Sequence, residues 1–217
     1  IVMRVYKNLP TILDSIAEKA ITKPVSIREV LARLDHFGFS IIALILVLPF
    51  MQPFPVGPIS VLGGVIFVIL GIQLLKRYGS PIFPEKILKA RIGFKGWQRI
   101  VKVCKLIIHW SKKITKPRLK IFVSGNTGIK FEGSILVLGG ILMAIPFGIL
   151  PLNNFFPGLA ILFATLAQFE KDGLFILIAI FWLFFSVFYF SIFFIAIYYI
   201  GLESIQYLPD WLLNLTK

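Results

Sequence analysis

The sequence has little charge, and charge is absent from three long stretches of the chain. Of the 217 residues, 58% are apolar and 15% are charged, whereas soluble domains average about 25% charged residues. No Asp, Glu, Lys or Arg occurs within residues 36–75, 133–169 and 173–202. Each interval is longer than the roughly 18 apolar residues that indicate a bilayer span. The sequence therefore predicts an integral membrane protein.

The groups that build catalytic and metal sites are also scarce. Cys104 is the single cysteine, which excludes an intramolecular disulfide and a thiolate metal cluster. His36 and His109 are far apart in the sequence, with no carboxylate or cysteine cluster around either, so neither is expected to bind a metal ion. There is no nucleophile-elbow, zinc-protease or phosphate-loop motif, and no segment suits a nucleotide-sugar domain. We therefore expect no enzyme activity, no metal and no cofactor.

The basic residues are concentrated in one segment. The chain has 23 Lys and Arg, and fifteen of them lie between Lys76 and Lys130, where Glu85 is the only acid. Basic loops of membrane proteins face the cytoplasm, so this segment is predicted to be cytoplasmic. An apolar helical stripe flanked by basic side chains is typical of helices on anionic lipid headgroups. The residues predicted to contact headgroups are Trp97, Arg99, Lys102, Lys105, Lys112 and Lys113. Nucleic-acid phosphates are the alternative, but no nucleic-acid motif accompanies the charge, and we expect no nucleic-acid partner.

The first apolar run is too long and too rich in proline to be one helix. A straight helix over residues 37–75 would be about 58 Å long, nearly twice the hydrocarbon core of about 30 Å. Prolines at positions 49, 53, 55 and 58 divide the run, because proline breaks a helix interior. Residues 38–75 are therefore predicted to form a helical hairpin whose broken tip lies inside or near the bilayer.

The second run, residues 133–169, repeats this design. Pro146, Pro151 and Pro157 interrupt it, with Asn153 and Asn154 between them. Aligning residues 65–79 with 159–173 indicates a weak internal repeat. A turn is predicted over residues 124–128, just before this hairpin.

The remaining segments complete a single membrane domain. Residues 174–200 contain neither Gly nor Pro and predict one long tilted transmembrane helix. Residues 1–37 predict two short amphipathic helices and lack the apolar block of a secretory signal. Residues 76–132 form the basic interfacial segment. Residues 201–217 form a tail that lacks the cluster of basic residues typical of cytoplasmic segments, so the tail is expected on the outer side of the membrane. The predicted fold is therefore an all-α, polytopic membrane protein with two proline-broken, re-entrant-like hairpins.

The broken tips are the predicted functional site. Backbone groups left unpaired at membrane depth cost several kcal/mol each unless protein, water or a ligand satisfies them. Pro58 and Pro157 are predicted to begin the second helix of each hairpin, so that N–H groups at each helix start point into the break and favour an anion or polar solute. The candidates for substrate binding are Gln52, Pro53, Pro55, Pro58, Gln73, Asn153, Asn154, Pro157 and Gln168. The alternatives are a purely structural hairpin and, for each amide, a helix–helix hydrogen bond. Glu170 and Asp172 are weak candidates for ion or proton coupling, with an ordinary charged turn as the alternative.

The layout resembles a known family, the exopolysaccharide synthesis proteins ExoD, over residues of about 26 to 200. The resemblance rests on "VLPFMQPFPVGPISVLGG", "GIQLLKRYGSPIFP", a basic amphipathic middle, and "IPFGILPLNNFFPGLAI" followed by "FEKDG". Family members commonly have Pro-Gly at the first tip, where this chain has Gly57-Pro58. The resemblance implies a bacterial inner-membrane protein associated with exopolysaccharide production and alkaline tolerance. It implies no reaction.

Two functions follow as alternatives. The first is a passive or ion-coupled transporter for a small polar or anionic solute, acting through the two hairpins. The second is a non-catalytic scaffold or regulator of the exopolysaccharide machinery, acting through the basic cytoplasmic face. Because two hairpins and one helix make a thin wall around a polar site, we expect a homo-oligomer, most simply a dimer.

Overall fold

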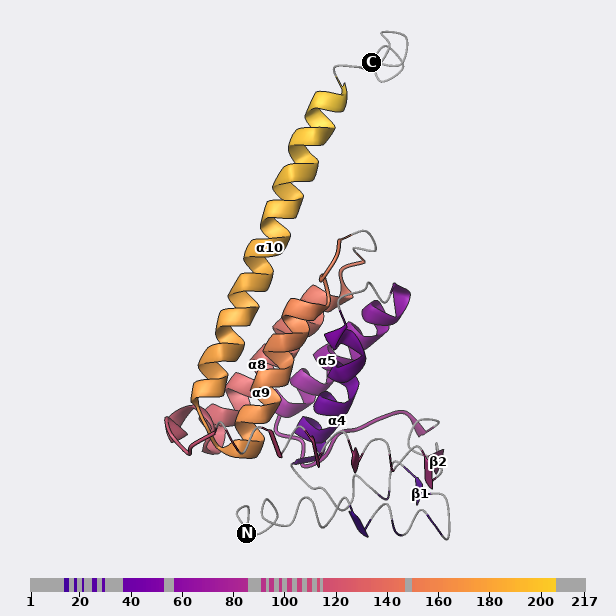
Figure 1. Ribbon diagram of the computed structural model, residues 1–217, viewed down its shortest axis with the longest axis vertical. Helices are drawn as coiled ribbons and strands as arrows, with labels where there is room; N and C mark the ends of the chain where they lie inside the picture. The colour runs from indigo at the N-terminus through magenta and orange to yellow at the C-terminus, as the bar shows by residue number, and fades with distance from the viewer. Residues whose placement is uncertain are drawn as a thin grey trace.

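The computed structural model describes residues 37–52, 57–85, 115–146 and 150–205, with shorter pieces between 14 and 29 and between 91 and 113. Most of the described chain is helical, as predicted, and its long helices alternate in direction (Figure 1). These helices are α4 (Phe37–Val47), α5 (Pro58–Leu75), α8 (Gly125–Ala144), α9 (Phe155–Glu170) and α10 (Leu174–Ile205). Two-residue strands β1 (Val25–Ser26) and β2 (Arg91–Ile92) form one antiparallel pair.

Three of the described helices are long and apolar enough to cross a membrane: α5, α8 and residues 174–200 of α10. Two shorter apolar helices accompany them. These are residues 38–51, which comprise α4 and the 3-10 turn η1 (Leu48–Met51), and α9. The chain is thus a helical membrane protein with three candidate spans.

The first tip forms where proline ends one helix and begins the next. α4 ends at Val47, and the chain continues through η1 to Met51, because Pro49 removes a donor that a longer α-helix needs. α5 begins at Pro58, which confirms the expectation for the first helical position. The preceding Gly57 has φ 61°, a backbone conformation that glycine adopts without strain.

The second hairpin differs from the prediction at both of its helix starts. α8 begins at Gly125 with Ser124 as its N-cap, so the turn predicted over 124–128 is wrong. α8 includes the charged residues Lys130 and Glu132. Lys130 is exposed, and Glu132 is hydrogen-bonded inside the bundle. α9 begins at Phe155, which places Pro157 third in the helix instead of first. The first turn tolerates this position because its N–H groups have no intrahelical acceptor.

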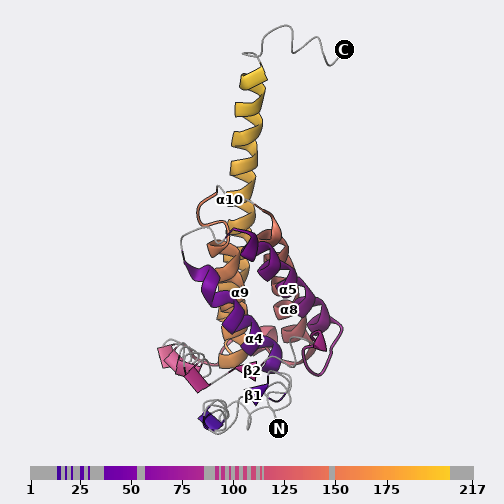
Figure 2. The same ribbon diagram turned by 90° about the vertical axis from the view of Figure 1, so that its right-hand side faces the viewer.

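The two hairpins pack against each other through two pairs of helices. α5 lies along α8, and α4 packs against α9 (Figure 2). A Cβ on Gly64 would lie 2.5 Å from the carbonyl oxygen of Gly140, and one on Gly71 would lie 2.7 Å from that of Gly133. These backbones therefore touch directly, as small residues allow at membrane helix crossings. Phe39, Phe67, Leu136, Met143 and Ile161 fill the core between the four helices.

α10 packs against the second hairpin along its first half only. Phe175 and Ile176 are buried against α9, and further along Tyr189 donates a hydrogen bond to the carbonyl oxygen of Pro151 at 2.7 Å. The remainder rises past the ends of the other described helices (Figure 1). Its large apolar side chains are exposed there at positions 192, 194, 195, 197, 198, 199 and 200.

Candidate functional site

The two hairpin tips lie beside each other at one end of the bundle. η1 packs against the start of α9, where Gly158 leaves room for the side chain of Met51. Gln52 and Pro58 are exposed at the two sides of the first tip. Pro53 and Pro55 lie outside the described residues. The structure therefore brings Gln52 and Pro58 to the same end of the bundle as the second tip.

The polar residues of the second tip are buried. Asn153 and Asn154 are 4% and 3% exposed. Asn154 is the N-cap residue of α9, yet its side chain makes no capping bond. Its amide nitrogen and amide oxygen both lack a hydrogen-bond partner, which costs about 1–3 kcal/mol for a buried polar group. Asn154 therefore has hydrogen-bonding capacity that the surrounding described protein does not use.

The backbone at this tip is more fully satisfied than the sequence suggested. Phe155 and Phe156 both donate their N–H groups to the carbonyl oxygen of Leu152, at 3.0 and 3.5 Å. Gly158 donates to the carbonyl oxygen of Asn154 at 3.0 Å, and Pro157 has no N–H to offer. The expectation that the start of α9 points free N–H groups into the break is therefore wrong. Among the buried side-chain atoms of the described residues, those without a hydrogen-bond partner are the amide nitrogen and oxygen of Asn154.

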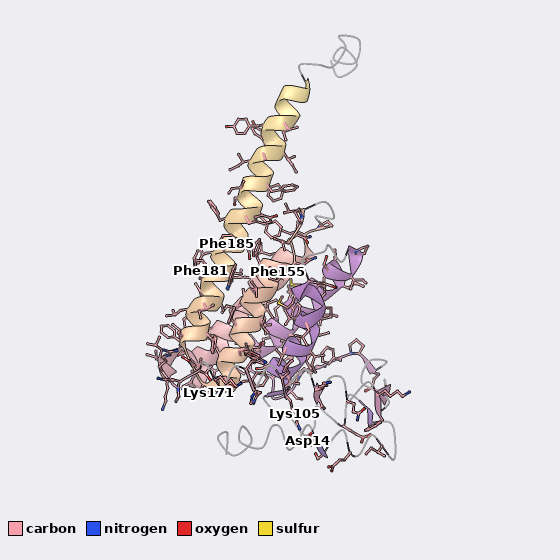
Figure 3. All side chains as sticks on the ribbon, in the orientation of Figure 1. Asp14, Lys105, Phe155, Lys171, Phe181 and Phe185 are labelled. Atoms are coloured by element: carbon pink, nitrogen blue, oxygen red, sulfur yellow. The ribbon has the colours of Figure 1, made fainter. Side chains whose placement is uncertain are left out.

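Aromatic rings from α10 enclose the second tip on one side. Phe156 stacks on Trp182, with ring centroids 5.8 Å apart, and meets Phe185 and Tyr189 edge to face. Figure 3 shows Phe181 and Phe185 on α10 at about the height of Phe155. The tip is thus held against α10 by aromatic packing.

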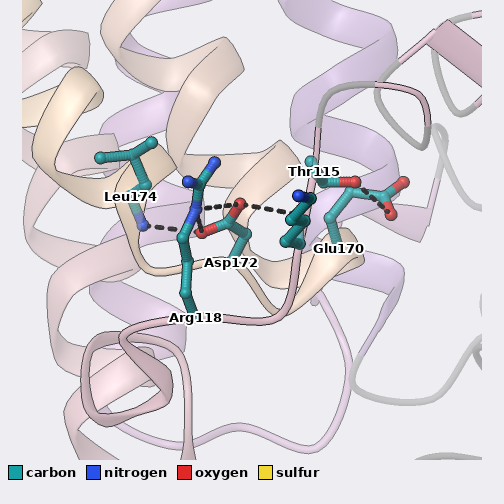
Figure 4. Close-up of polar contacts among 6 residues, drawn as sticks. Thr115, Arg118, Glu170, Asp172 and Leu174 are labelled. Carbon is teal, nitrogen blue, oxygen red and sulfur yellow. Dashed lines mark hydrogen bonds and ion pairs between the residues drawn. The ribbon is translucent and has the colours of Figure 1, made fainter.

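Asp172, at the opposite end of the bundle, joins residues 116–118 to the start of α10 (Figure 4). Its carboxylate is buried and accepts hydrogen bonds from the backbone N–H groups of Lys116 and Leu174, at 3.2 and 3.1 Å. The guanidinium Nε of Arg118 lies 3.3 Å from the same carboxylate. Glu170 is half-buried and accepts a bond from the Thr115 hydroxyl at 3.3 Å. These contacts fasten residues 115–118 to the turn between α9 and α10.

The candidate glutamines Gln73 and Gln168 both form hydrogen bonds within the protein. Gln73 exchanges two hydrogen bonds with the backbone of Ile82, at 2.9 and 2.8 Å. Gln168 donates to the carbonyl oxygen of Gly128 at 3.1 Å, which joins α9 to α8. Lys171 donates to the Gln168 side-chain oxygen at 3.4 Å. Burial lowers the pKa of the Lys171 ammonium, and the attraction of Glu132 opposes that shift.

Glu132 is the polar residue that the sequence reasoning missed. It is 4% exposed and lies inside the bundle on α8. The hydroxyl of Ser40, on α4, donates to Glu132 Oε1 at 2.6 Å. The available signal was the position of Glu132 as the last acid before a long charge-free stretch. Among the described residues, no group of three His, Cys, Asp or Glu side chains is placed to hold a metal ion.

The N-terminal segment contacts the basic segment. Lys105 forms an ion pair with Asp14, as labelled in Figure 3, and β1 pairs with β2. Lys113 lies over the ring of Trp110, 5.3 Å from its centroid. Lys102 is exposed, whereas Trp97, Arg99 and Lys112 lie outside the described residues.

Comparisons with known proteins find one family and no structural precedent. The family model described as "Exopolysaccharide synthesis, ExoD" matches residues 9–192. The chain is 26% identical over 166 residues to "Protein ExoD" of Rhizobium meliloti (strain 1021), covering 76% of this chain and 68% of that protein. No solved structure matches the chain.

Proposed function

The chain belongs to the ExoD family of exopolysaccharide synthesis proteins, and from this premise we propose that it is a transporter for a small polar or anionic solute. As a family member with three candidate spans, it is a membrane protein associated with exopolysaccharide synthesis. The proposal places that association downstream of solute movement, which is passive or coupled to an ion. It assigns the protein no catalytic reaction.

The observation that carries the proposal is the unsatisfied side chain of Asn154. A buried amide with two unpartnered atoms is a standing energetic penalty of about 1–3 kcal/mol. A solute with both a hydrogen-bond donor and an acceptor would remove that penalty on binding. Polar residues within membrane-spanning bundles mark substrate pathways for the same reason.

The interrupted helices give this amide a setting suited to a solute. Both tips lie at one end of the bundle (Figure 1). Discontinuous helices in paired repeats form the binding sites of many transporters. α10 shows that this chain also forms a long helix without any break, so the breaks at the tips are not required for spanning alone.

The proposal includes an orientation and an environment. The basic segment, residues 76–132, faces the cytoplasm of a bacterium, with Trp97, Arg99, Lys102, Lys105, Lys112 and Lys113 on anionic lipid of the inner membrane. The hairpin tips then point toward the far side, and the C-terminus lies outside. The assembly is a homodimer.

One observation favours the competing role as a scaffold. The ion pair of Lys105 with Asp14 and the pairing of β1 with β2 join the N-terminal and basic segments. A partner-binding face on the cytoplasmic side would be built from these segments. A scaffold therefore predicts that function depends on the basic face and not on the tips.

Solute flux into proteoliposomes separates the two functions. One variant carries Asn153→Leu and Asn154→Leu, and a second carries Lys102→Gln, Lys105→Gln, Lys112→Gln and Lys113→Gln. Asn126→Leu is the matched control, because Asn126 is an exposed amide at the other end of the bundle that accepts a bond from Arg77. We expect the tip variant to lose flux by tenfold or more, an effect worth about 1.4 kcal/mol or more, while the control keeps it.

Complementation of a deletion strain completes the test, with membrane insertion verified for every variant. The transporter proposal fails if the purified wild type moves no tested solute, and the tip variant restores exopolysaccharide while the basic-face variant does not.

A further inference from the structure

Glu132 is the buried acid of the helical bundle. It lies about 10 Å along α8 from the start of that helix and is 4% exposed. The described residues 37–47, 58–75, 155–169 and 174–200 contribute no Asp, Glu, Lys, Arg or His. α8 itself adds Lys130, which is exposed. The described parts of the helices around Glu132 therefore contribute no basic residue to balance its charge.

The direct hydrogen-bond partner of Glu132 is a neutral hydroxyl. Ser40 is 3% exposed on α4 and donates to Glu132 Oε1 at 2.6 Å. One hydroxyl compensates only a small part of the free energy needed to bury a carboxylate. Ionisable residues in such positions mark ion pathways and proton relays.

Charged groups approach Glu132 from one end of the bundle. Lys171, at the end of α9, is the base that interacts with it electrostatically. At that end Asp172 pairs with Arg118, Glu170 with Thr115 and Arg77 with Asn126, whereas the lysines at positions 76, 116, 120 and 130 are exposed. Lys171 donates to Gln168, and Gln168 donates to Gly128, one turn before Glu132 on α8, so polar side chains link the Lys171 end of the bundle to α8.

From this geometry we propose that Glu132 is an exchangeable proton-binding site, fed from the Lys171 end of the bundle and tuned by Ser40. A hydronium ion transfers its proton to one carboxylate oxygen: one O–H bond of the hydronium ion breaks, the O–H bond of the neutral acid forms, and a water molecule is left. Release of the proton to water reverses the step. Proton binding is independent of the proposed transport; only the use of that proton to drive solute movement rests on the transporter proposal.

A purely structural role makes a different prediction. If Glu132 only latches α8 to α4, a glutamine serves equally well, because its side-chain oxygen also accepts the Ser40 hydroxyl. Glu132→Gln therefore keeps the latch and removes the proton site. Glu85→Gln is the control, since it makes the same chemical change in an exposed acid outside the long helices.

Infrared difference spectroscopy on the full chain in lipid vesicles tests the proposal. We expect a protonated-carboxyl C=O band that changes with pH and shifts in D2O, in the wild type and in Glu85→Gln. Glu132→Gln should lack it, and Ser40→Ala should move its frequency. If Glu132→Gln does not fold, Glu132→Asp replaces it and should shift the band. A band that never responds to pH or D2O, or spectra that are the same in wild type and Glu132 variants, overturns the site.

Flux measurements keep this failure separate from that of the transporter. A wild type that shows the responsive band but moves no solute removes the transport proposal and leaves the proton site. A wild type that moves solute but lacks the band removes the proton site alone. If the wild type shows the responsive band and also moves solute, we expect Glu132→Gln to reduce the flux driven by a pH gradient at least tenfold.

Discussion

At the scale of single residues, Gly140 is a position with no room for a side chain. A Cβ at this residue would lie 2.7 Å from the carbonyl oxygen of Gly64 and 2.9 Å from the backbone nitrogen of Val68. Because backbone atoms cannot rotate away as a side chain does, we expect Gly140→Ala to separate α5 from α8. Overpacking typically costs about 1–3 kcal/mol, and the effect here belongs at the upper end. Thermal unfolding in detergent measures it.

Gly79→Ala is the control for this substitution, since a Cβ on Gly79 meets nothing within 4 Å. An unchanged unfolding temperature for Gly140→Ala, equal to that of the control, would show that the two helices are not in direct backbone contact.

Residues whose role is local were predictable from the sequence, and residues whose role depends on a distant partner were not. Pro58 begins α5 because its own ring fixes the backbone for that position. Glu132 is buried on α8, where Ser40, far away in the sequence, donates a hydrogen bond to it. Asn154 was identified as a polar tip residue, but its lack of partners follows from the packing around it. No local pattern encodes either arrangement.

At the scale of elements, the length of α10 indicates how deeply the hairpin tips reach into the membrane. The second tip meets this helix at Tyr189, about 22 Å from its start, whereas its apolar run continues to about 40 Å. A bilayer core is about 30 Å thick. We therefore expect the tips to stop within the bilayer, short of its far surface.

Cysteine labelling in a Cys104→Ser background measures this depth. We expect Gln52→Cys to resist a membrane-impermeant maleimide from either side. Ser124→Cys is the positive control and should label only from the cytoplasmic side. Full labelling of Gln52→Cys from outside would mean that the hairpins cross the membrane completely.

Element boundaries show the same division between local and distant information. The apolar runs predicted all five long helices, because hydrophobic length is a property of the segment itself. The start of α8 was placed two turns too late, since Lys130 and Glu132 were taken as marks of the water-exposed segment. A charged residue can lie within a membrane helix when another part of the fold offers it a hydrogen bond. Here Ser40 of α4 donates one to Glu132.

At the scale of the whole molecule, α10 offers a surface for a second copy. Phe181, Phe184 and Phe188 are 60%, 72% and 62% exposed and follow a helical spacing along one stripe. We expect a homodimer, and Phe184→Ala with Phe188→Ala should shift it toward monomer. Mass photometry in nanodiscs measures the change. Ile59→Ala with Leu62→Ala, on the exposed face of α5, is the control; a wild type that is monomeric and active contradicts the assembly.

The unequal lengths of the helices give the protein a tapered cross-section. Five helices run side by side at the end of the bundle next to the basic segment, and beyond Tyr189 α10 continues without another described helix beside it (Figure 1). Such a wedge displaces more lipid from one leaflet than from the other. The protein should therefore prefer membranes that bend, with the wide end on the convex side, and should sort unequally between flat membrane and a tubule pulled from a giant vesicle.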